Sequence, residues 1–138
     1  MRPDRQHRVA SFAAVALTWA LGLLGLGRRA LWIDEADSVY FAAQSVCTLL
    51  TALCDPHPPG YYLLLKGWLV WGRSEVWVRI PSVAMATLAV ALTMRLGRSL
   101  GASAPRRAGR PLGVLSGWLL AVSPLHLWYG REARMYAT

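Results

Sequence analysis

Three long apolar runs constrain this chain more than any other feature of its sequence. The first, Val9–Gly27, contains 19 residues and no charge. As a helix that rises ~1.5 Å per residue, it would cover a hydrocarbon core of roughly 30 Å. The second run covers about 77–97, with an arginine near each end, and the third covers 111–129. The sequence therefore predicts an all-α integral membrane protein with three transmembrane helices.

The composition favours a multi-pass membrane protein over a soluble helical bundle. Hydrophobic residues make up 55% of the chain and charged residues 16%, whereas ordinary globular proteins have about 25% charged residues. The chain also has seven tryptophans and five tyrosines. These two side chains favour the boundary between membrane and water, where one end of the ring is apolar and the other is wet.

The net charge of +8 does not indicate a nucleic-acid partner, because the cations are divided by the apolar runs. Eight arginines lie before the first run or around the loop at 98–110, opposed only by Asp4, so this side carries +7. The other side has seven basic and six acidic residues, a net of +1. Short loops rich in arginine stay in the cytoplasm. We therefore expect a cytoplasmic N-terminus, a cytoplasmic loop at 98–110 and an outer loop at 28–76.

Alternatives remain for the first run and for the outer loop. The first run follows three arginines, as a signal peptide would, although signal cores usually span about 7–15 residues. The stretch from Ser38 to Cys54 is mildly amphipathic and predicts a helix along the outer interface. If it spanned the membrane instead, the topology of everything downstream would reverse. The segment 61–72 is apolar and aromatic, and it either lies in the interface with Lys66 reaching water or dips partway into the membrane.

Two prolines bear on the second and third predicted crossings. Pro81 is expected in the first turn of its helix, where no intrahelical donor is lost. Pro124 is expected to kink the third crossing near its outer end, beside an aromatic belt formed by Trp128 and Tyr129.

Two acidic clusters each follow an apolar run, Asp34-Glu35 after the first and Glu132 after the third. With three crossings, both clusters emerge on the same face of the membrane. A carboxylate in partly dry surroundings has a raised pKa, which suits it to accept a proton from an attacking alcohol. Asp34 is therefore a candidate base, with Glu35 as its partner. The alternative is that both acids begin a helix, where they stabilise its free N–H groups.

Four other side chains are candidates for binding a polar or phosphorylated substrate. Arg131 and Arg134 can hold a phosphate, because the guanidinium group matches its oxygens in two-pronged geometry; local pairing of both with Glu132 is the alternative. Arg79 either reaches a lipid phosphate or anchors its helix among the headgroups. His57 donates to a substrate group or lies in a rigid surface turn.

The order of four motifs carries a family resemblance. The chain contains, in sequence, W-I-D-E-A-D-S, D-P-H-P-P-G-Y-Y-L-L-L-K-G-W, V-W-V-R-I-P-S and S-P-L-H-L-W-Y-G-R-E-A-R-M-Y-A. This series resembles the amino-terminal part of bacterial membrane glycosyltransferases of family 39 and their relatives, which include protein O-mannosyltransferases and lipid A aminoarabinose transferases. The resemblance implies the GT-C fold, a location in the bacterial cytoplasmic membrane, and an active face outside. It also implies a longer enzyme, of which this chain would be an inactive fragment.

The resemblance also implies roles for residues. The donor would be a polyprenyl-phosphate sugar, with Asp34 as catalytic acid or base, Glu35 beside it and Glu132 in the acidic region of the second outer loop. Tyr61 belongs to the second motif and joins the substrate-binding candidates. A divalent metal ion takes part in some such enzymes and not in others; Asp34 and Glu132 would be its ligands here. The sugar and the acceptor are not specified.

Two other classes of membrane protein remain as alternatives. A non-catalytic multi-pass module, such as a carrier or an assembly subunit, would have the same apolar runs. A different enzyme acting on lipid phosphate, such as a phosphatase or an acyltransferase, would commonly rely on motifs centred on histidine, and the histidines of this chain lack companion motifs.

Overall fold

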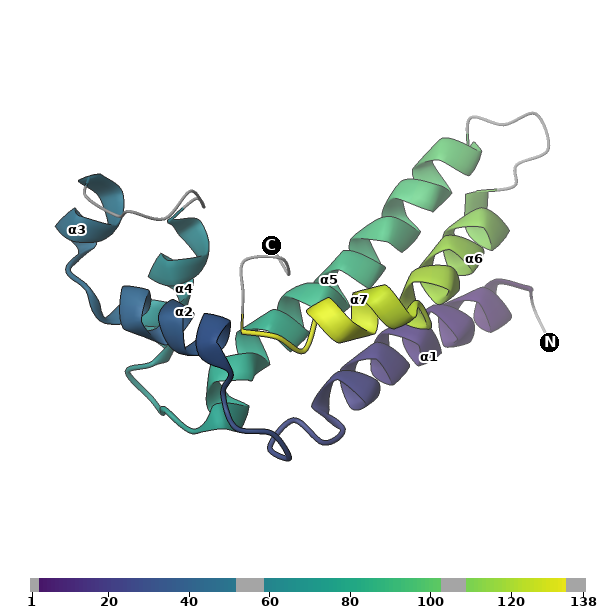
Figure 1. The fold of residues 1–138 in the computed structure, drawn as a ribbon. Coiled ribbons are helices and arrows are strands. Elements are labelled where there is room, and N and C mark those ends of the chain that lie inside the picture. The colour runs from purple at the N-terminus through teal and green to yellow at the C-terminus, as the bar shows by residue number, and fades with distance from the viewer. Residues whose placement is uncertain (1–2, 52–58, 103–108, 134–138) are drawn as a thin grey trace.

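A computed structural model shows the chain as an assembly of helices (Figure 1). It describes residues 3–51, 59–102 and 109–133, and these contain helices and no strand. The helices are α1 (Pro3–Leu23), α2 (Ile33–Ala43), α3 (Val46–Thr51), α4 (Gly60–Trp68), α5 (Glu75–Ala102), α6 (Gly109–Ala121) and α7 (Pro124–Tyr129). The predicted all-α class is confirmed.

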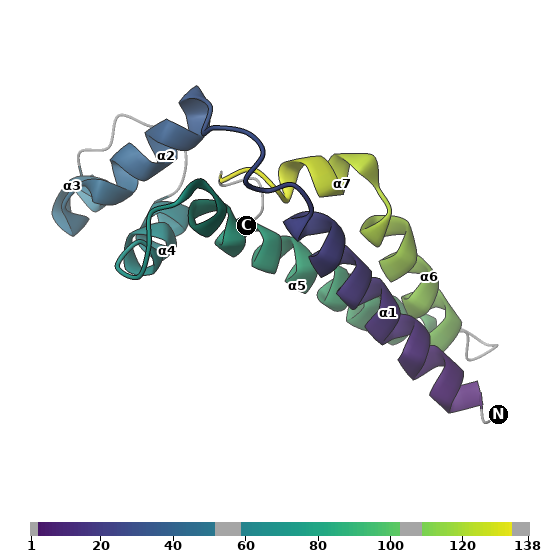
Figure 2. The same cartoon turned by 90° about the horizontal axis from the view of Figure 1, so that it is seen from below.

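Helices α1, α5 and α6 pack side by side as a three-helix bundle (Figures 1 and 2). Its centre holds small and flexible apolar side chains, Ala14, Val90, Met94 and Ala121, each at most 2% exposed. The shorter helices α2, α3 and α4 lie together beyond one end of the bundle, next to the start of α5. The chain therefore has two packing units, and the segments between α1 and α2 and after α7 lie near their junction.

Helix α5 is the one helix, in the parts of the chain that the structure describes, that is long and apolar enough to cross a membrane. It covers the predicted crossing at 77–97 and extends it at both ends. Helix α1 begins earlier than the predicted range, within the charged segment, and ends at Leu23, four residues before Gly27. A turn follows in which Gly25 has a φ of 71°, a conformation that glycine adopts without steric cost.

The third predicted crossing, 111–129, consists of two helices in the structure and not of the single kinked helix expected. α6 ends at Ala121 and α7 begins at Pro124. Proline has no N–H to continue the ladder, and its ring disfavours a helical conformation in the residue before it. Ser123 is accordingly extended, with a ψ of 121°, and its hydroxyl accepts a hydrogen bond from the His126 N–H at 3.5 Å. Pro124 therefore breaks the helix instead of bending it.

Glycines allow α5 and α6 to approach each other closely. A Cβ added at Gly113 would lie 2.5 Å from the Met94 carbonyl oxygen, and one at Gly109 would lie 2.4 Å from the Arg98 carbonyl oxygen. On α6, glycine recurs at every fourth position at 109, 113 and 117, and on α5 at 97 and 101. Small residues at this spacing are typical of close helix contacts inside membranes.

The start of α5 differs from the prediction for Pro81. Because the helix begins at Glu75, Pro81 lies in its interior and leaves the Trp77 carbonyl without its usual helical donor. The Trp68 Nε1–H donates to that carbonyl at 2.9 Å, and the Trp77 Nε1–H donates to the Trp68 carbonyl at 3.2 Å. The two indole rings stack with centroids 4.6 Å apart. This reciprocal pair joins α4 to α5 and compensates for the proline.

The segment after α1 forms two short helices where one helix was expected from Ser38 to Cys54. α2 begins earlier, at Ile33, and the chain is extended at Gln44, with a ψ of 164°, before α3. Lys66 of α4 donates from Nζ to the carbonyls of Gln44, at 2.6 Å, and Ala42, at 3.3 Å. A cation at a helix C-terminus satisfies its free carbonyls and complements its dipole. Lys66 is therefore bonded within the protein, at the C-terminal end of α2.

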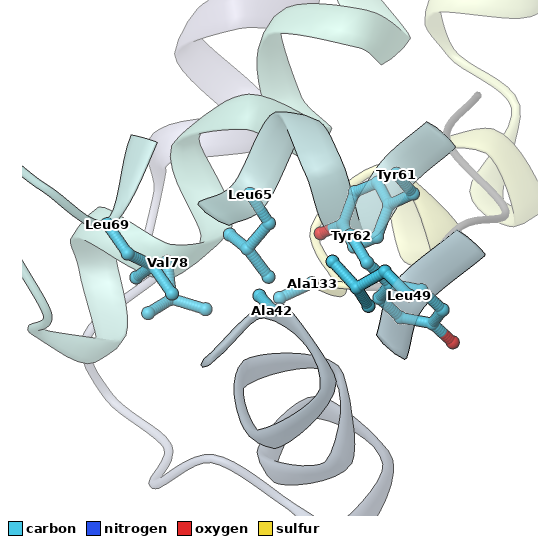
Figure 3. Close-up of a cluster of buried hydrophobic side chains, with 8 residues drawn as sticks. All are labelled: Ala42, Leu49, Tyr61, Tyr62, Leu65, Leu69, Val78 and Ala133. Atoms are coloured by element: carbon cyan, nitrogen blue, oxygen red, sulfur yellow. The ribbon is translucent and has the colours of Figure 1, made fainter. Parts of the chain in front are cut away.

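A compact apolar cluster holds α2, α3 and α4 against α5 (Figure 3). Tyr61, Tyr62 and Leu65 of α4 are at most 2% exposed, and they pack with residues from the neighbouring helices. Ala133, which follows α7, is fully buried in the same cluster. The end of the described chain is thereby fixed beside the start of α2.

Candidate functional site

An open cleft of about 810 Å³ lies where the segment after α1 meets α7. Its lining comes from four places: the turn that follows α1, the start of α2, one arginine of α5, and α7 with the residues after it. The ionisable side chains in this lining are Arg28, Arg29, Glu35, Arg79, Arg131 and Glu132. The cleft therefore collects charged groups from both ends of the sequence.

Glu35 and Arg79 form a buried ion pair at the base of this region. Arg79 donates from Nε to Glu35 Oε1 at 2.8 Å and from Nη2 to Oε2 at 2.5 Å. Glu35 is 1% exposed and Arg79 is 6% exposed. This two-pronged arrangement is the strong form of a carboxylate–guanidinium contact. It links α2 to α5 across 44 positions of sequence.

Arg79 uses all of its donors inside the protein. Besides the two bonds to Glu35, it donates to the backbone carbonyls of Leu26, Arg29 and Ala30, at 2.5, 2.9 and 3.1 Å. A guanidinium group has five N–H donors, and these five bonds account for them. Arg79 therefore fixes the segment between α1 and α2, and it would have to give up existing bonds to hold a phosphate.

Glu35 accepts two further hydrogen bonds from the backbone. The Trp32 N–H donates to Oε2 at 3.4 Å, as in a helix capping box, and the Ala133 N–H donates to Oε1 at 3.0 Å. The second bond brings the residue after Glu132 against the first acidic cluster. Burial raises the pKa of Glu35, but the bonds from Arg79 and the two backbone groups outweigh it and hold that pKa below its ordinary value.

Asp34 occupies a different place from its neighbour. It lies in the first turn of α2, is half-buried, and does not belong to the lining of the cleft. The alternative that the two acids begin a helix is therefore confirmed. The role of Asp34 as a base stays a prediction. The structural partner of Glu35 is Arg79 and not Asp34.

Glu132 and Arg131 both line the cleft, as a shared site requires. Glu132 lies close enough to Arg79 for its charge to act on that guanidinium. Arg131 donates from Nη2 to the carbonyl of Leu24 in the turn after α1. These contacts join the second acidic segment to the first one through the turn after α1.

Arg28 and Arg29 are cleft residues that the sequence analysis did not single out. Both are exposed, and Arg29 lies over the ring of Trp128 with its Cζ 5.7 Å from the ring centroid. The signal was present in the sequence as two consecutive arginines directly after the first apolar run. With Arg131, they make three cations whose side chains border the same opening.

The remaining candidates do not join the cleft in the described part of the chain. Tyr61 is 2% exposed and forms a 3.0 Å hydrogen bond with the Ser82 hydroxyl. Its burial, with the nearby charge of Glu35, raises its pKa to about 12. His57 and Arg134 lie outside the described residues.

The described part of the chain has no complete set of ligands for the predicted metal ion. Among residues 3–51, 59–102 and 109–133, no group of three or more histidine, cysteine, aspartate or glutamate side chains is arranged to hold an ion. Of the two predicted ligands, Glu132 lines the cleft and Asp34 does not. The described residues thus do not fit a metal site.

Comparison with protein-family models, with curated proteins and with solved structures found no match to this chain.

Proposed function

We propose that this chain is part of a multi-pass membrane glycosyltransferase that uses a polyprenyl-phosphate sugar as donor. The cleft is the observation that supports this most. Its lining includes Arg28, Arg29, Arg131 and Glu132, beside the Glu35–Arg79 pair near the first turns of α5. A lipid-linked donor keeps its phosphate at the level of the headgroups, and the end of a spanning helix lies at that level.

The proposal includes three membrane crossings and the GT-C fold, in the bacterial cytoplasmic membrane with the active face outside. Exposed apolar side chains support a lipid environment. On α5, Leu88, Leu92, Leu96 and Leu100 recur at every fourth position and are 48–63% exposed. Large apolar side chains are also exposed along α1 and α6, such as Phe12 at 75%. Soluble monomers rarely expose apolar surface on this scale.

The proposed reaction is displacement of a lipid phosphate by an acceptor hydroxyl. The hydroxyl oxygen forms a bond to the anomeric carbon of the sugar, and its proton passes to Asp34 acting as base. The bond from that carbon to the phosphate oxygen breaks, and the electron pair leaves with the phosphate. Arg28, Arg29 and Arg131 stabilise the negative charge that develops there. Exclusion of water favours transfer over hydrolysis of the donor.

The two glutamates take different roles in this proposal. Glu35 is a positioning residue, because its pairing with Arg79 fixes the turn that carries Arg28 and Arg29. Glu132 lines the cleft, and its proposed role is to bind a hydroxyl of the sugar or of the acceptor.

The test measures transfer from a radiolabelled polyprenyl-phosphate sugar in membranes of cells that express the complete gene. We expect Asp34→Asn to lower the rate by roughly 10²-fold or more, as removal of a general base does. Asp37→Asn is the matched control, because Asp37 is an exposed acid on the same helix, and it should keep the rate. Full transfer by Asp34→Asn would exclude Asp34 as the base, and release of free sugar without transfer would indicate a hydrolase.

A non-catalytic membrane module is the alternative that one specific observation favours. Asp34 lies outside the cleft lining and Glu35 is occupied by Arg79, so the acidic pair can be purely structural. This alternative predicts that the donor binds but is not consumed in the same membranes.

A further inference from the structure

Three helix ends lie at the same end of the bundle (Figures 1 and 2), opposite the turn after α1 that lines the cleft. They are the first turns of α1, the last turns of α5 and the first turn of α6. Each contributes arginines to this basic end, which consists of Arg5, Arg8, Arg95, Arg98 and Arg110. All of these except Arg98 are exposed.

Arg98 shows how closely the three helices bring these cations together. Its Nη2 donates to the Ser11 hydroxyl of α1 at 2.6 Å. Its side chain also lies against α6, since a Cβ added at Gly113 would fall 2.4 Å from Arg98 Cγ. Arg8 precedes Ser11 by three positions, and Arg110 precedes Gly113 by three positions. Residues three apart share a helix face, so Arg8 and Arg110 flank Arg98 from the two sides.

Acidic side chains do not balance this charge. Asp4 is the one acidic residue before Asp34, and no acidic residue occurs between Glu75 and Glu132. The basic end therefore carries a local excess of positive charge, which attracts anions.

Apolar side chains border the same arginines. Val9 and Phe12 on α1 are 61% and 75% exposed, and Leu96 and Leu100 on α5 are 60% and 63% exposed. Leu112 follows Arg110 by two positions and is 41% exposed. Exposed cations beside exposed apolar side chains suit a ligand that carries an anionic headgroup on an acyl chain. Nucleic acid or free phosphate would contact the cations alone.

We propose that the basic end is a binding surface for anionic phospholipids. The arginines contact the headgroup phosphate, and the neighbouring valine, phenylalanine and leucine side chains contact the acyl chains. The proposal rests on placement of the bundle in a membrane and is independent of sugar transfer. Its ligand lies at the opposite end of the bundle from the cleft.

The detergent-purified chain is mixed with equimolar phosphatidylglycerol and phosphatidylcholine. Native mass spectrometry then counts the lipids that stay bound. We expect preferential retention of phosphatidylglycerol, with each contacting arginine contributing roughly a fivefold preference. A variant with Arg8→Gln, Arg95→Gln and Arg110→Gln together should reduce the preference by roughly 10²-fold, and the same three positions as lysine should keep it. Arg73→Gln, which removes one exposed arginine from the loop before α5, is the control and should bind as the wild type does.

Two further measurements identify the source of the bound anion and check that the variants fold. Inorganic phosphate at millimolar concentration should compete poorly, because it lacks acyl chains; equal competition would overturn the lipid assignment. Circular dichroism should give the triple glutamine variant wild-type helicity. If that variant fails to fold, the wild-type comparison still decides, since equal retention of the two phospholipids would overturn the proposal.

Discussion

Two opposite charges, those of Glu35 and Arg79, are buried in the described part of the chain and are held by each other. Removing water from two charges costs several kcal/mol per ion, and the pair offsets this only when the remaining donors and acceptors are satisfied. Here the carboxylate accepts two additional backbone bonds and the guanidinium donates three. This pair therefore links α2, α5 and the end of the described chain.

Breaking this pair from one side should strongly destabilise the protein. Glu35→Gln leaves the Arg79 charge buried without its counter-ion, and we expect a loss of about 3–5 kcal/mol in the free energy of unfolding. Thermal unfolding in detergent, followed by circular dichroism, measures it. Asp37→Asn alters an exposed acid on the same helix and should change stability by about 0.5 kcal/mol or less. Equal effects from the two substitutions would contradict the structural role of the pair.

The same carboxylate predicts a loss of stability in acid. The pKa of Glu35 is lower in the folded chain than its ordinary value of 4.5. The stability that this group contributes is therefore fully present above 4.5 and is lost as the pH falls below 4.5 through the folded pKa. Unfolding temperature should decline over that range in the wild type and decline less in Glu35→Gln. Parallel declines would show that other carboxylates dominate.

At the scale of helices, length and apolarity predicted α5. They did not predict the break between α6 and α7. The third run is uncharged over its full length, yet Pro124 ends α6, because a proline inside a helix removes a donor and crowds the preceding residue. The opposite occurred at Pro81, which stays inside α5 because Trp68 supplies the missing donor. The difference depends on tertiary contacts that a local sequence pattern does not contain.

Glycine substitution tests the close contact between α5 and α6. Gly113→Ala places a Cβ within 2.5 Å of the Met94 carbonyl oxygen, so the two helices must separate, and we expect a cost of about 1–3 kcal/mol. Gly67→Ala is the matched control in α4, where an added Cβ meets nothing within 4 Å. That change should be neutral or stabilise by up to about 1 kcal/mol, because alanine favours the helix. Comparable unfolding temperatures for the two variants would refute close packing at Gly113.

At the scale of the whole molecule, the sequence located the charged segments but not their pairing. The expectation that two acidic loops meet rested on a count of three crossings, and the structure brings them together through the Ala133 N–H and Glu35. Nothing in the local sequence indicates that Glu35 pairs with Arg79, 44 positions later. The cleft arginines Arg28 and Arg29 were visible as a tandem, yet only the fold brings them beside Arg131.

At the scale of the complete chain, we predict which side of the membrane each charged segment faces. Single cysteines in place of Asp34, Glu132 and Arg8 are expressed in a background with Cys47→Ser and Cys54→Ser, and intact cells are treated with a membrane-impermeant maleimide. We expect labelling at positions 34 and 132 from outside, and at position 8 only after the membrane is permeabilised, because the arginine-rich end stays in the cytoplasm. Labelling of 34 and 132 from opposite sides would separate the two acidic segments. In that case the cleft would not exist in the membrane, and the proposed transfer reaction would lose its site.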